Sequence, residues 1–311
     1  MDRIEEDITA YLERIVEEER REDHRGAMES SMDNAGESGK DLLGVCAVST
    51  EGTLTKAGDA DEIFALESAS KPLGLALALE DNGADAVFQH VATEPTGDPY
   101  HSVATLEEGE RGVPSNPMIN AGAIAVTAMI KGKDGDERFQ RLLDFTRKLT
   151  GNPRVDYNHT MFEAKEKDLN RALFYYMRSH GVVNGSEEEK LVPYIKQTLI
   201  EMDGTDLARI AAVLANQGRD PESGKQLISA DNVRIVLTLM FTTGMYDASG
   251  RFAVDVGIPA KSGLSGVILA VVPGRMGLGI LGPALDESGS SIAGVRILRK
   301  LTRRWQLGVF S

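Results

Sequence analysis

Hydrophobic residues recur along this chain with helical spacing in some segments and in short strand-like runs in others. Residues 2–22 are charged on one side and carry an apolar stripe, which predicts an amphipathic helix; the stripe consists of Ile4, Ile8, Tyr11, Leu12 and Ile15. Residues 42–50 and 51–58 read as two strands with Glu51-Gly52 between them, which predicts a β-hairpin. The polar residues 23–41 between these elements predict a loop.

From Ser68 to about residue 240 the pattern is mostly helical. Five segments have helical periodicity, and most of them end in glycine, the residue that most often terminates a helix; they are residues 120–130, 136–151, 168–181, 203–218 and 229–244. The chain between the hairpin and residue 240 is therefore expected to be a largely helical unit.

The last third of the chain returns to strand-like patterns. Strands are predicted in "RFAVDVG" (251–257), "GVILAVVPG" (266–274) and "MGLGILGP" (276–283), and a final helix in residues 290–306. Such closely spaced strands favour antiparallel pairing, and strands from the two ends of the chain can share one sheet. We expect an α+β fold: an antiparallel sheet domain of residues 1–66 and 241–311, flanked by terminal helices, with a mostly helical domain of residues 67–240 inserted and the active site between them.

Composition and charge narrow the range of partners. The 311 residues carry a net charge of −14, which argues against binding to nucleic acid or to an anionic membrane, because both depend on clustered Lys and Arg. Cys46 is the only cysteine, and the N-terminus lacks an apolar signal segment. No pair among the five histidines has metal-ligand spacing. We expect a cytoplasmic protein without a metal or other cofactor.

Residues 68–71 read Ser-Ala-Ser-Lys, a Ser-x-x-Lys motif. Three residues make almost one helical turn, so Ser68 and Lys71 are expected on the same face of a helix start. A lysine with a lowered pKa can take the proton of a serine hydroxyl, and a helix N-terminus directs N–H groups toward a developing oxyanion. The alternative is that Ser68 or Ser70 only caps the helix, with Pro72 in its first turn.

A second motif makes the catalytic interpretation stronger. Lys261-Ser262-Gly263 stands just before a strongly apolar strand. Lys-Ser/Thr-Gly on an edge strand, together with Ser-x-x-Lys at a helix start, is typical of serine acyl-enzymes related to penicillin-binding proteins. Lys261 could hold Lys71 deprotonated by repulsion or receive a substrate carboxylate, whereas the alternative is a solvated lysine in a turn.

Three longer segments show a family resemblance: "EPTGDPYHS", "NPMINAGAI" and "GMYDASGRFAVDVGIPAKSG". From about residue 52 to 300 the chain resembles the serine-dependent glutaminases, which share a β-lactamase/transpeptidase-like fold. The resemblance implies hydrolysis of L-glutamine to L-glutamate and ammonia, without a cofactor. It also implies a homo-oligomer, either a dimer or a tetramer.

The resemblance also implies roles for individual residues. Ser68 is the expected nucleophile and Lys71 its base, Lys261 is the lysine of the second motif, and Tyr194 could relay a proton to the leaving ammonia. The N–H groups of Ser68 and Leu264 are the expected oxyanion hole. Substrate binding falls to Ser68, Asn120, Glu163, Asn170, Tyr194, Tyr246 and Leu264. Because Glu163 and Asn170 are seven residues apart, two helical turns would place them on one helix face.

The chain departs from the family pattern at several places, among them the segments at residues 194–200 and 94–102 and the following two. Glu67 stands before the nucleophile where the family usually has Gln, and a carboxylate there raises the pKa of the neighbouring lysine. The family's N-terminal Tyr-Ile-Pro segment is missing from residues 20–41. Two alternatives therefore stay open: a β-lactamase or penicillin-binding-type hydrolase, suggested by "EKDLN" at residues 166–170, and an amino-acid-binding member with altered catalysis.

Overall fold

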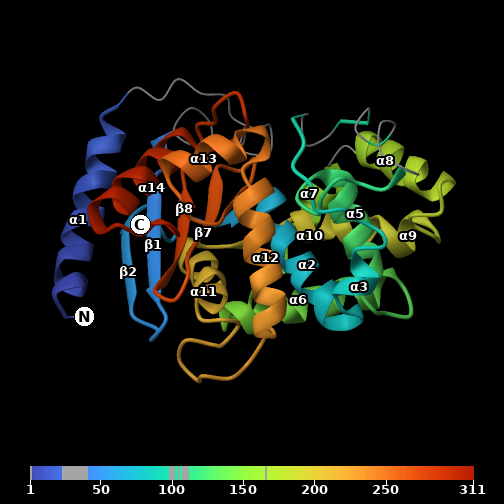
Figure 1. Cartoon of the computed structure of the whole chain (residues 1–311), viewed down its shortest axis with the longest axis horizontal. Coiled ribbons are helices and arrows are strands. Elements are labelled where there is room, and N and C mark those ends of the chain that lie inside the picture. The colour runs from blue at the N-terminus through green and yellow to red at the C-terminus, as the bar shows by residue number, and fades with distance from the viewer. Residues whose placement is uncertain (1, 23–40, 98–101, 104–105, 107–111, 165–166) are drawn as a thin grey trace.

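Both ends of the sequence contribute strands to one antiparallel sheet (Figure 1). The computed structural model describes residues 2–22, 41–97, 102–103, 106, 112–164 and 167–311. The five strands run in the order β2-β1-β8-β7-β6. They are β1 (Gly44–Ser49), β2 (Leu54–Gly58), β6 (Ala260–Ser262), β7 (Val267–Val272) and β8 (Met276–Leu281). The predicted hairpin is thus confirmed, and the second motif lies on the edge strand β6.

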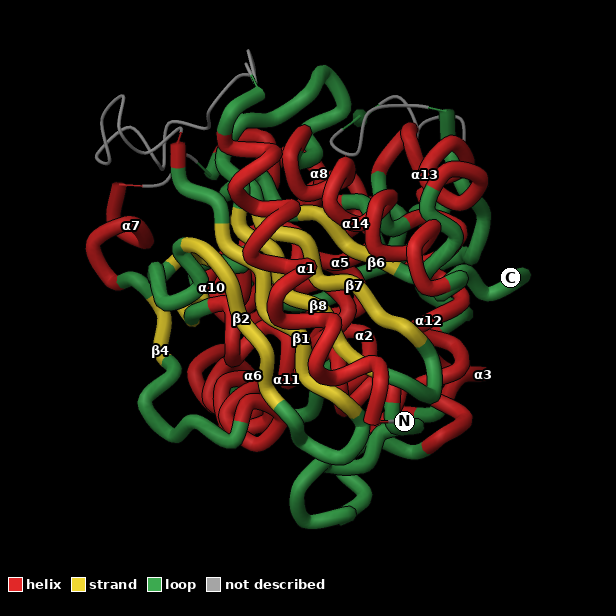
Figure 2. Tube along the Cα trace, turned by 90° about the vertical axis from the view of Figure 1, so that its left-hand side faces the viewer, coloured by secondary structure: helices red, strands yellow, loops and turns green. Residues whose placement is uncertain are grey.

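Helices cover both faces of this sheet. The terminal helices α1 (Asp2–Arg20) and α14 (Ile292–Trp305) lie together over one face (Figure 2), and α11 (Gly204–Ala215) packs on the other. Strand β7 is buried on both sides: Ile268 joins the core under the terminal helices, while Leu269 joins the core on the α11 side. This double burial explains why β7 is a continuous apolar run and does not alternate.

Glycines in β8 allow α11 to approach the sheet closely. A Cβ at Gly277 would lie 2.0 Å from the Ala212 nitrogen, and one at Gly279 would lie 2.6 Å from the Gly204 carbonyl oxygen. Because these neighbours are backbone atoms of α11, any side chain at either position would push the helix away from the sheet.

The helical part of the chain lies beside the sheet (Figure 1). Its helices are α2 (Lys71–Asn82), α3 (Ala84–Val87), α5 (Asn120–Met129), α6 (Gly135–Thr150), α7 (His159–Ala164), α8 (Asp168–Ser179), α9 (Glu187–Lys190), α10 (Val192–Thr198) and α12 (Ala230–Thr243). It also contains a small sheet that the sequence did not predict, formed by β3 (Phe64–Ala65), β5 (Ile200–Met202) and β4 (Asp156–Tyr157). The domain boundaries at residues 66 and 240 stay a prediction.

The strand predicted for residues 251–257 is wrong. Residues Ser249–Asp255 form helix α13. Phe252 and Val256 are both buried, whereas Val254 is 87% exposed. The two buried residues are four apart, so their spacing fits a short helix with one inward face, although the same letters also read as a β-rich run.

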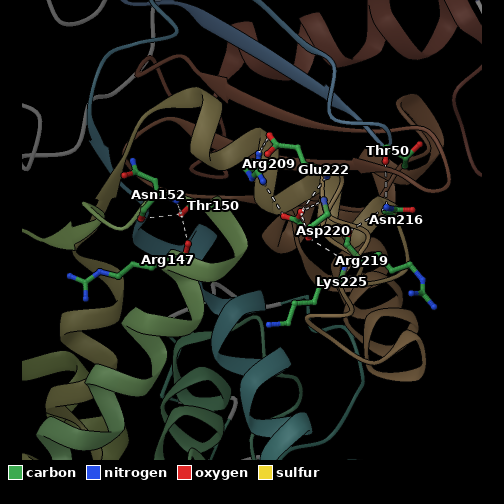
Figure 3. Close-up of polar contacts among 11 residues, drawn as sticks. Thr50, Arg147, Thr150, Asn152, Arg209, Asn216, Arg219, Asp220, Glu222 and Lys225 are labelled. Carbon is green, nitrogen blue, oxygen red and sulfur yellow. Dashed lines mark hydrogen bonds and ion pairs between the residues drawn. The ribbon is translucent and has the colours of Figure 1, made fainter.

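A network of polar side chains fastens the loop that follows α11 (Figure 3). Arg209 of α11 forms ion pairs with Asp220, at 3.0 Å, and with Glu222. Asn216 Nδ2 donates to the Thr50 carbonyl in the β1–β2 turn at 3.4 Å. The loop leading to α12 is therefore tied both to α11 and to the sheet.

Candidate active site

The Ser68 turn lies between the two parts of the fold. Residues Glu67–Ser70 form a buried 3₁₀ turn, η3, that leads directly into α2. The Leu66 N–H donates to the Ile200 carbonyl at 2.8 Å. On the other side, Ser265 Oγ donates to the Ala65 carbonyl at 2.6 Å. The turn is therefore held by β5 on one side and by the loop after β6 on the other.

The structure does not support a simple capping role for the serines. Ser70 is the N-cap of α2, but its side chain makes no capping hydrogen bond. Its hydroxyl instead donates to the Glu67 carbonyl at 2.7 Å. Pro72 stands in the first turn of α2, as predicted.

Glu67 has a strained backbone. Its φ angle is +46°, in the left-handed region that non-glycine residues rarely adopt, and the residue is buried. Such a conformation costs about 1–3 kcal/mol and persists only where surrounding contacts hold it. Strain beside Ser68 is typical of a functional turn.

Lys71 has the hydrogen bonding of a buried base. Its side chain is 1% exposed, and its Nζ donates to the Met118 carbonyl at 3.1 Å and to Asn120 Oδ1 at 2.7 Å. Burial lowers the pKa of Lys71 to about 7, while the nearby Glu67 carboxylate acts to raise it. A neutral amine has two N–H bonds and one lone pair. In the neutral form these two acceptors take both N–H bonds, and the lone pair is the position that accepts a proton.

Asn120 connects Lys71 with α8. While its Oδ1 accepts from Lys71, its Nδ2 donates to Asn170 Oδ1 at 3.3 Å. The chain Lys71–Asn120–Asn170 joins three of the predicted site residues from α2, α5 and α8. Asn120 and Asn170 are both half-buried, so each can be reached by a small ligand.

The expectation that Glu163 and Asn170 share one helix face is wrong. Glu163 lies on α7, which ends at Ala164, and Asn170 lies on α8, which begins at Asp168. Glu163 is exposed, and no hydrogen bond joins it to another predicted site residue in the described part of the chain. The charged run that follows Glu163 includes residues 165 and 166, which lie outside the described residues.

Lys261 and Tyr246 meet at one carbonyl. Lys261 Nζ donates to the Ser262 carbonyl at 2.7 Å, and Tyr246 OH donates to the same oxygen at 3.2 Å. The Nζ also lies 3.9 Å from the centre of the Tyr246 ring. Burial, together with the charge of Lys71, holds the pKa of Lys261 well below its usual range. Burial is the largest cause of the lowered pKa of Lys71.

The loop after β6 touches the Ser68 turn. A Cβ at Gly263 would lie 2.5 Å from the Leu66 carbonyl oxygen and 3.4 Å from the Ala69 nitrogen. Only glycine allows this approach. Within the described residues, no turn or loop hydrogen bond engages the N–H of Leu264, and the N–H of Ser68 lies in the first turn of η3, where a helix leaves its donors without an intrahelical partner. Two backbone donors are therefore available on the two segments that meet here.

Tyr194 is 2% exposed on α10, and α10 packs against η3. Its side chain belongs to the same apolar core as residues of α5 and α8. The structure thus places Tyr194 on a helix next to the Ser68 turn.

Sequence reasoning missed two buried amides near the site. Asn116 Oδ1 accepts from the Met118 N–H at 3.0 Å, which shapes the loop that presents the Met118 carbonyl to Lys71. Gln197 Nε2 donates to the Ser70 carbonyl at 3.0 Å. Asn116 belongs to the segment "NPMINAGAI", where only Asn120 was singled out. A polar letter alone gives no sign that its side chain is buried.

The described residues show no sign of a metal site or of a membrane-spanning helix. They contain no group of three or more His, Cys, Asp or Glu side chains that could hold a metal ion. None of their helices has both the length and the apolar character needed to cross a membrane. Cys46 is free and buried. The N-terminal departure at residues 20–41 falls mostly on residues 23–40, outside the described part.

Comparisons with known proteins give the family. The model of the Glutaminase family matches residues 26–310. A Shouchella clausii glutaminase is 52% identical over 273 residues, covering 87% of this chain and 88% of that protein. A Geobacillus thermodenitrificans glutaminase is 46% identical over 301 residues, covering 96% and 97%.

Solved structures give the same family. The probable glutaminase of Bacillus subtilis superposes with a TM-score of 0.91 at 34% identity, covering 98% of each chain. Another structure of a B. subtilis probable glutaminase, complexed with 6-diazo-5-oxo-L-norleucine, has a TM-score of 0.86 at 33% identity, covering 97% and 96%. These neighbours have a β-lactamase-like fold, which confirms the expected fold class. The β-lactamase and binding-protein alternatives gain no support, and this chain belongs to the glutaminase family, whose members hydrolyse glutamine.

Proposed function

We propose that this chain hydrolyses L-glutamine to L-glutamate and ammonia through an acyl-enzyme on Ser68, with Lys71 as the general base. The observation that carries the proposal is the hydrogen bonding of Lys71. In its neutral form the buried amine directs its two N–H bonds to Met118 and Asn120, one turn after the serine, so its basic position is the lone pair. With a pKa of about 7, the amine can accept and return a proton near neutral pH.

In the first step Ser68 Oγ attacks the side-chain carbonyl carbon of glutamine, and its proton passes to Lys71 Nζ. The negative charge that develops on the carbonyl oxygen is stabilised by the N–H groups of Ser68 and Leu264. The carbon–nitrogen bond then breaks, and the nitrogen takes a proton from Lys71, with Tyr194 as the relay, and leaves as ammonia. A water molecule then attacks the γ-glutamyl ester and gives a proton to Lys71. Lys71 passes this proton to Ser68 Oγ as the ester bond breaks, and glutamate is released.

The substrate's charged groups need partners that the chain supplies near this serine. Asn120, Asn170, Tyr194 and Tyr246 offer amide and hydroxyl groups to the α-carboxylate and α-ammonium, and Glu163 offers a carboxylate to the ammonium. Because Glu163 is exposed on α7, its role requires that the ligand bridges α7 and α8. A site of this kind rejects analogues that leave its polar groups unpaired.

The test is ammonia release from L-glutamine by the purified chain, by Ser68→Ala and by the control Ser223→Ala, whose serine lies on an exposed loop. Removing the nucleophile of a serine hydrolase abolishes nearly all of its rate acceleration. We expect Ser68→Ala to lose more than about 10³-fold in rate and Ser223→Ala to keep the wild-type rate. A Ser68→Ala variant with near-normal turnover would overturn the proposal.

We propose further that the chain works in the cytoplasm as a homo-oligomer, and that its domain boundaries lie near residues 66 and 240. Large apolar side chains at the surface, including Val254 at 87% and Phe310 at 88% exposure, support self-association, since such groups are common at interfaces. Light scattering in solution would give the oligomeric state. A monomer at all working concentrations would refute that part.

A further inference from the structure

The strained turn at Ser68 is connected to a chain of buried hydrogen bonds that no proposed role explains. Ser70 Oγ donates to the carbonyl of Glu67, the strained residue directly before the nucleophile, at 2.7 Å. Gln197 Nε2 in turn donates to Ser70 Oγ at 3.3 Å and to the Ser70 carbonyl at 3.0 Å. The carboxamide of Gln197 therefore reaches the strained peptide through one intervening hydroxyl.

The far side of the same carboxamide is also anchored. Thr127 Oγ1 donates to Gln197 Oε1 at 2.9 Å. Ser70 and Gln197 are fully buried and Thr127 is 1% exposed, so water does not compete for these bonds. A carbonyl only accepts, so the Ser70 carbonyl requires the nitrogen of the carboxamide on its side, and this leaves the oxygen for Thr127. The amide thus has one orientation.

Packing prevents the amide from moving away. A Cβ at Gly74 of α2 would lie 2.9 Å from Gln197 Oε1 and 3.1 Å from Nε2. The helix that carries Lys71 therefore passes directly against the carboxamide. Any shift of this amide would therefore displace both η3 and α2.

The three anchored elements are the ones that carry predicted site residues. Gln197 follows Tyr194 by three residues on α10, and Thr127 follows Asn120 by seven on α5. On a helix both spacings place the paired residues near the same face. One buried amide thus joins the segments of Ser68, Tyr194 and Asn120.

We propose that Gln197, acting through Ser70, is a positioning residue that holds the strained Ser68 turn in its reactive geometry. The inference rests on the proposed role of Ser68 as the nucleophile. Two buried donor bonds act on residue 70, and one of them continues to the carbonyl of residue 67. Without them the turn relaxes, and Ser68 Oγ loses its alignment with the substrate carbon. Substrate binding by Asn120, Asn170 and Tyr246 is left in place.

Two variants test the connection at different points. Gln197→Glu keeps the size of the side chain and an acceptor for Thr127, and, assayed above the pKa of the new carboxyl, it has no donor for Ser70. Ser70→Ala removes the hydroxyl that links Gln197 to the Glu67 carbonyl. A misplacement of about 1 Å in a reacting group costs about 10²-fold, so we expect kcat for ammonia release to fall between about 10- and 100-fold in both variants. KM should stay within about twofold, because the binding groups are unchanged.

The matched control is Thr146→Val. Thr146 is also fully buried, and its hydroxyl donates to a backbone carbonyl, that of Leu142, at 2.9 Å within α6. The Thr146→Val substitution removes the same kind of hydrogen bond as Ser70→Ala, but away from the Ser68 turn. We expect it to lower the thermal unfolding temperature by a similar amount and to leave kcat unchanged.

A second readout follows the first chemical step alone. The glutamine analogue 6-diazo-5-oxo-L-norleucine traps a nucleophile covalently, so its limiting inactivation rate reports the reactivity of Ser68. We expect this rate to fall in parallel with kcat in Ser70→Ala and Gln197→Glu, with little change in the concentration that gives half the limiting rate. If Gln197→Glu does not fold, Ser70→Ala alone decides the matter.

These experiments distinguish a failure of the positioning role of Gln197 from a failure of the proposed function. An inactive Ser68→Ala together with wild-type kcat and inactivation rate in folded Ser70→Ala would overturn the positioning role and leave the function intact. A loss of kcat in Thr146→Val equal to that in Ser70→Ala would also overturn it, because general destabilisation would then suffice. An active Ser68→Ala would remove the basis of both proposals.

Discussion

Replacing Lys71 with methionine should change how stability depends on pH. Lys71 is 1% exposed, and burial lowers its pKa from 10.5 to about 7. In the unfolded chain the lysine returns to a pKa of about 10.4. Between the two values the unfolded state binds more protons, so the free energy of unfolding rises with pH. The folded and unfolded pKa values of Lys71 differ by about 3.5, and each pKa unit is worth about 1.36 kcal/mol. The free energy of unfolding is therefore roughly 5 kcal/mol lower below pH 7 than above both pKa values.

The assay is urea unfolding of the wild type and Lys71→Met at pH 7.5 and 9.5. Methionine keeps the length of the buried chain and does not titrate. Over this interval the wild type should gain about 2.7 kcal/mol relative to the variant. The hydrogen bonds to Met118 and Asn120 are lost in the variant at both pH values, so they add an offset that does not vary with pH. Because the charge of Lys71 also lowers the pKa of Lys261, the same comparison in a Lys261→Met background isolates the contribution of Lys71.

The matched control is Lys148→Met on α6, at a solvent-exposed position. Folding does not bury this lysine, so its replacement should give the same difference in unfolding free energy at both pH values. If Lys71→Met behaved like this control, the ammonium of Lys71 would not be disfavoured by its site. Burial would then not be what prepares Lys71 as a base.

Three further predictions concern activity. Because the neutral amine of Lys71 is the active form and its pKa is about 7, kcat/KM for L-glutamine should be level above that pH and fall about tenfold per unit below it; a flat profile from pH 5 to 8 would contradict this. Glu67→Gln removes the carboxylate that raises the pKa of Lys71, so the acid limb of the same profile should move to lower pH, and a shift to higher pH would be the wrong sign. Gly263→Ala places a Cβ 2.5 Å from the Leu66 carbonyl oxygen, whereas one at Gly250 meets nothing within 4 Å; ammonia-release assays should show a loss of about 10²- to 10³-fold for the first and no change for Gly250→Ala, and equal activity would contradict the close approach.

Long, strongly periodic segments could be predicted from sequence, because their apolar spacing reflects one buried face. Helices α5, α6, α11 and α12 all fall where the pattern places them. Short segments could not be predicted from sequence. Residues 249–255 form about two turns of helix, whose few apolar letters fit a strand equally well. The break between α7 and α8 likewise interrupts a run that reads as continuous helix.

The candidate site was predictable where chemistry demands particular residue types in sequence. Ser68 and Lys71, and Lys261 with Gly263, belong to short motifs that the fold brings together. Gln197 was not predictable, because its hydrogen-bond partners Ser70 and Thr127 are 127 and 70 residues away in the chain. A buried amide and a surface amide have the same letter, and only long-range packing distinguishes them.

The role of Ser68 as the nucleophile is tested most directly by finding which residue bonds covalently to a glutamine analogue. The chain is treated with 6-diazo-5-oxo-L-norleucine until ammonia release from L-glutamine stops, and the modified peptide is mapped by mass spectrometry. We expect one adduct per chain, on Ser68, and no modification of Ser68→Ala under the same conditions. Complete inactivation with the adduct on another residue and Ser68 unmodified would contradict it.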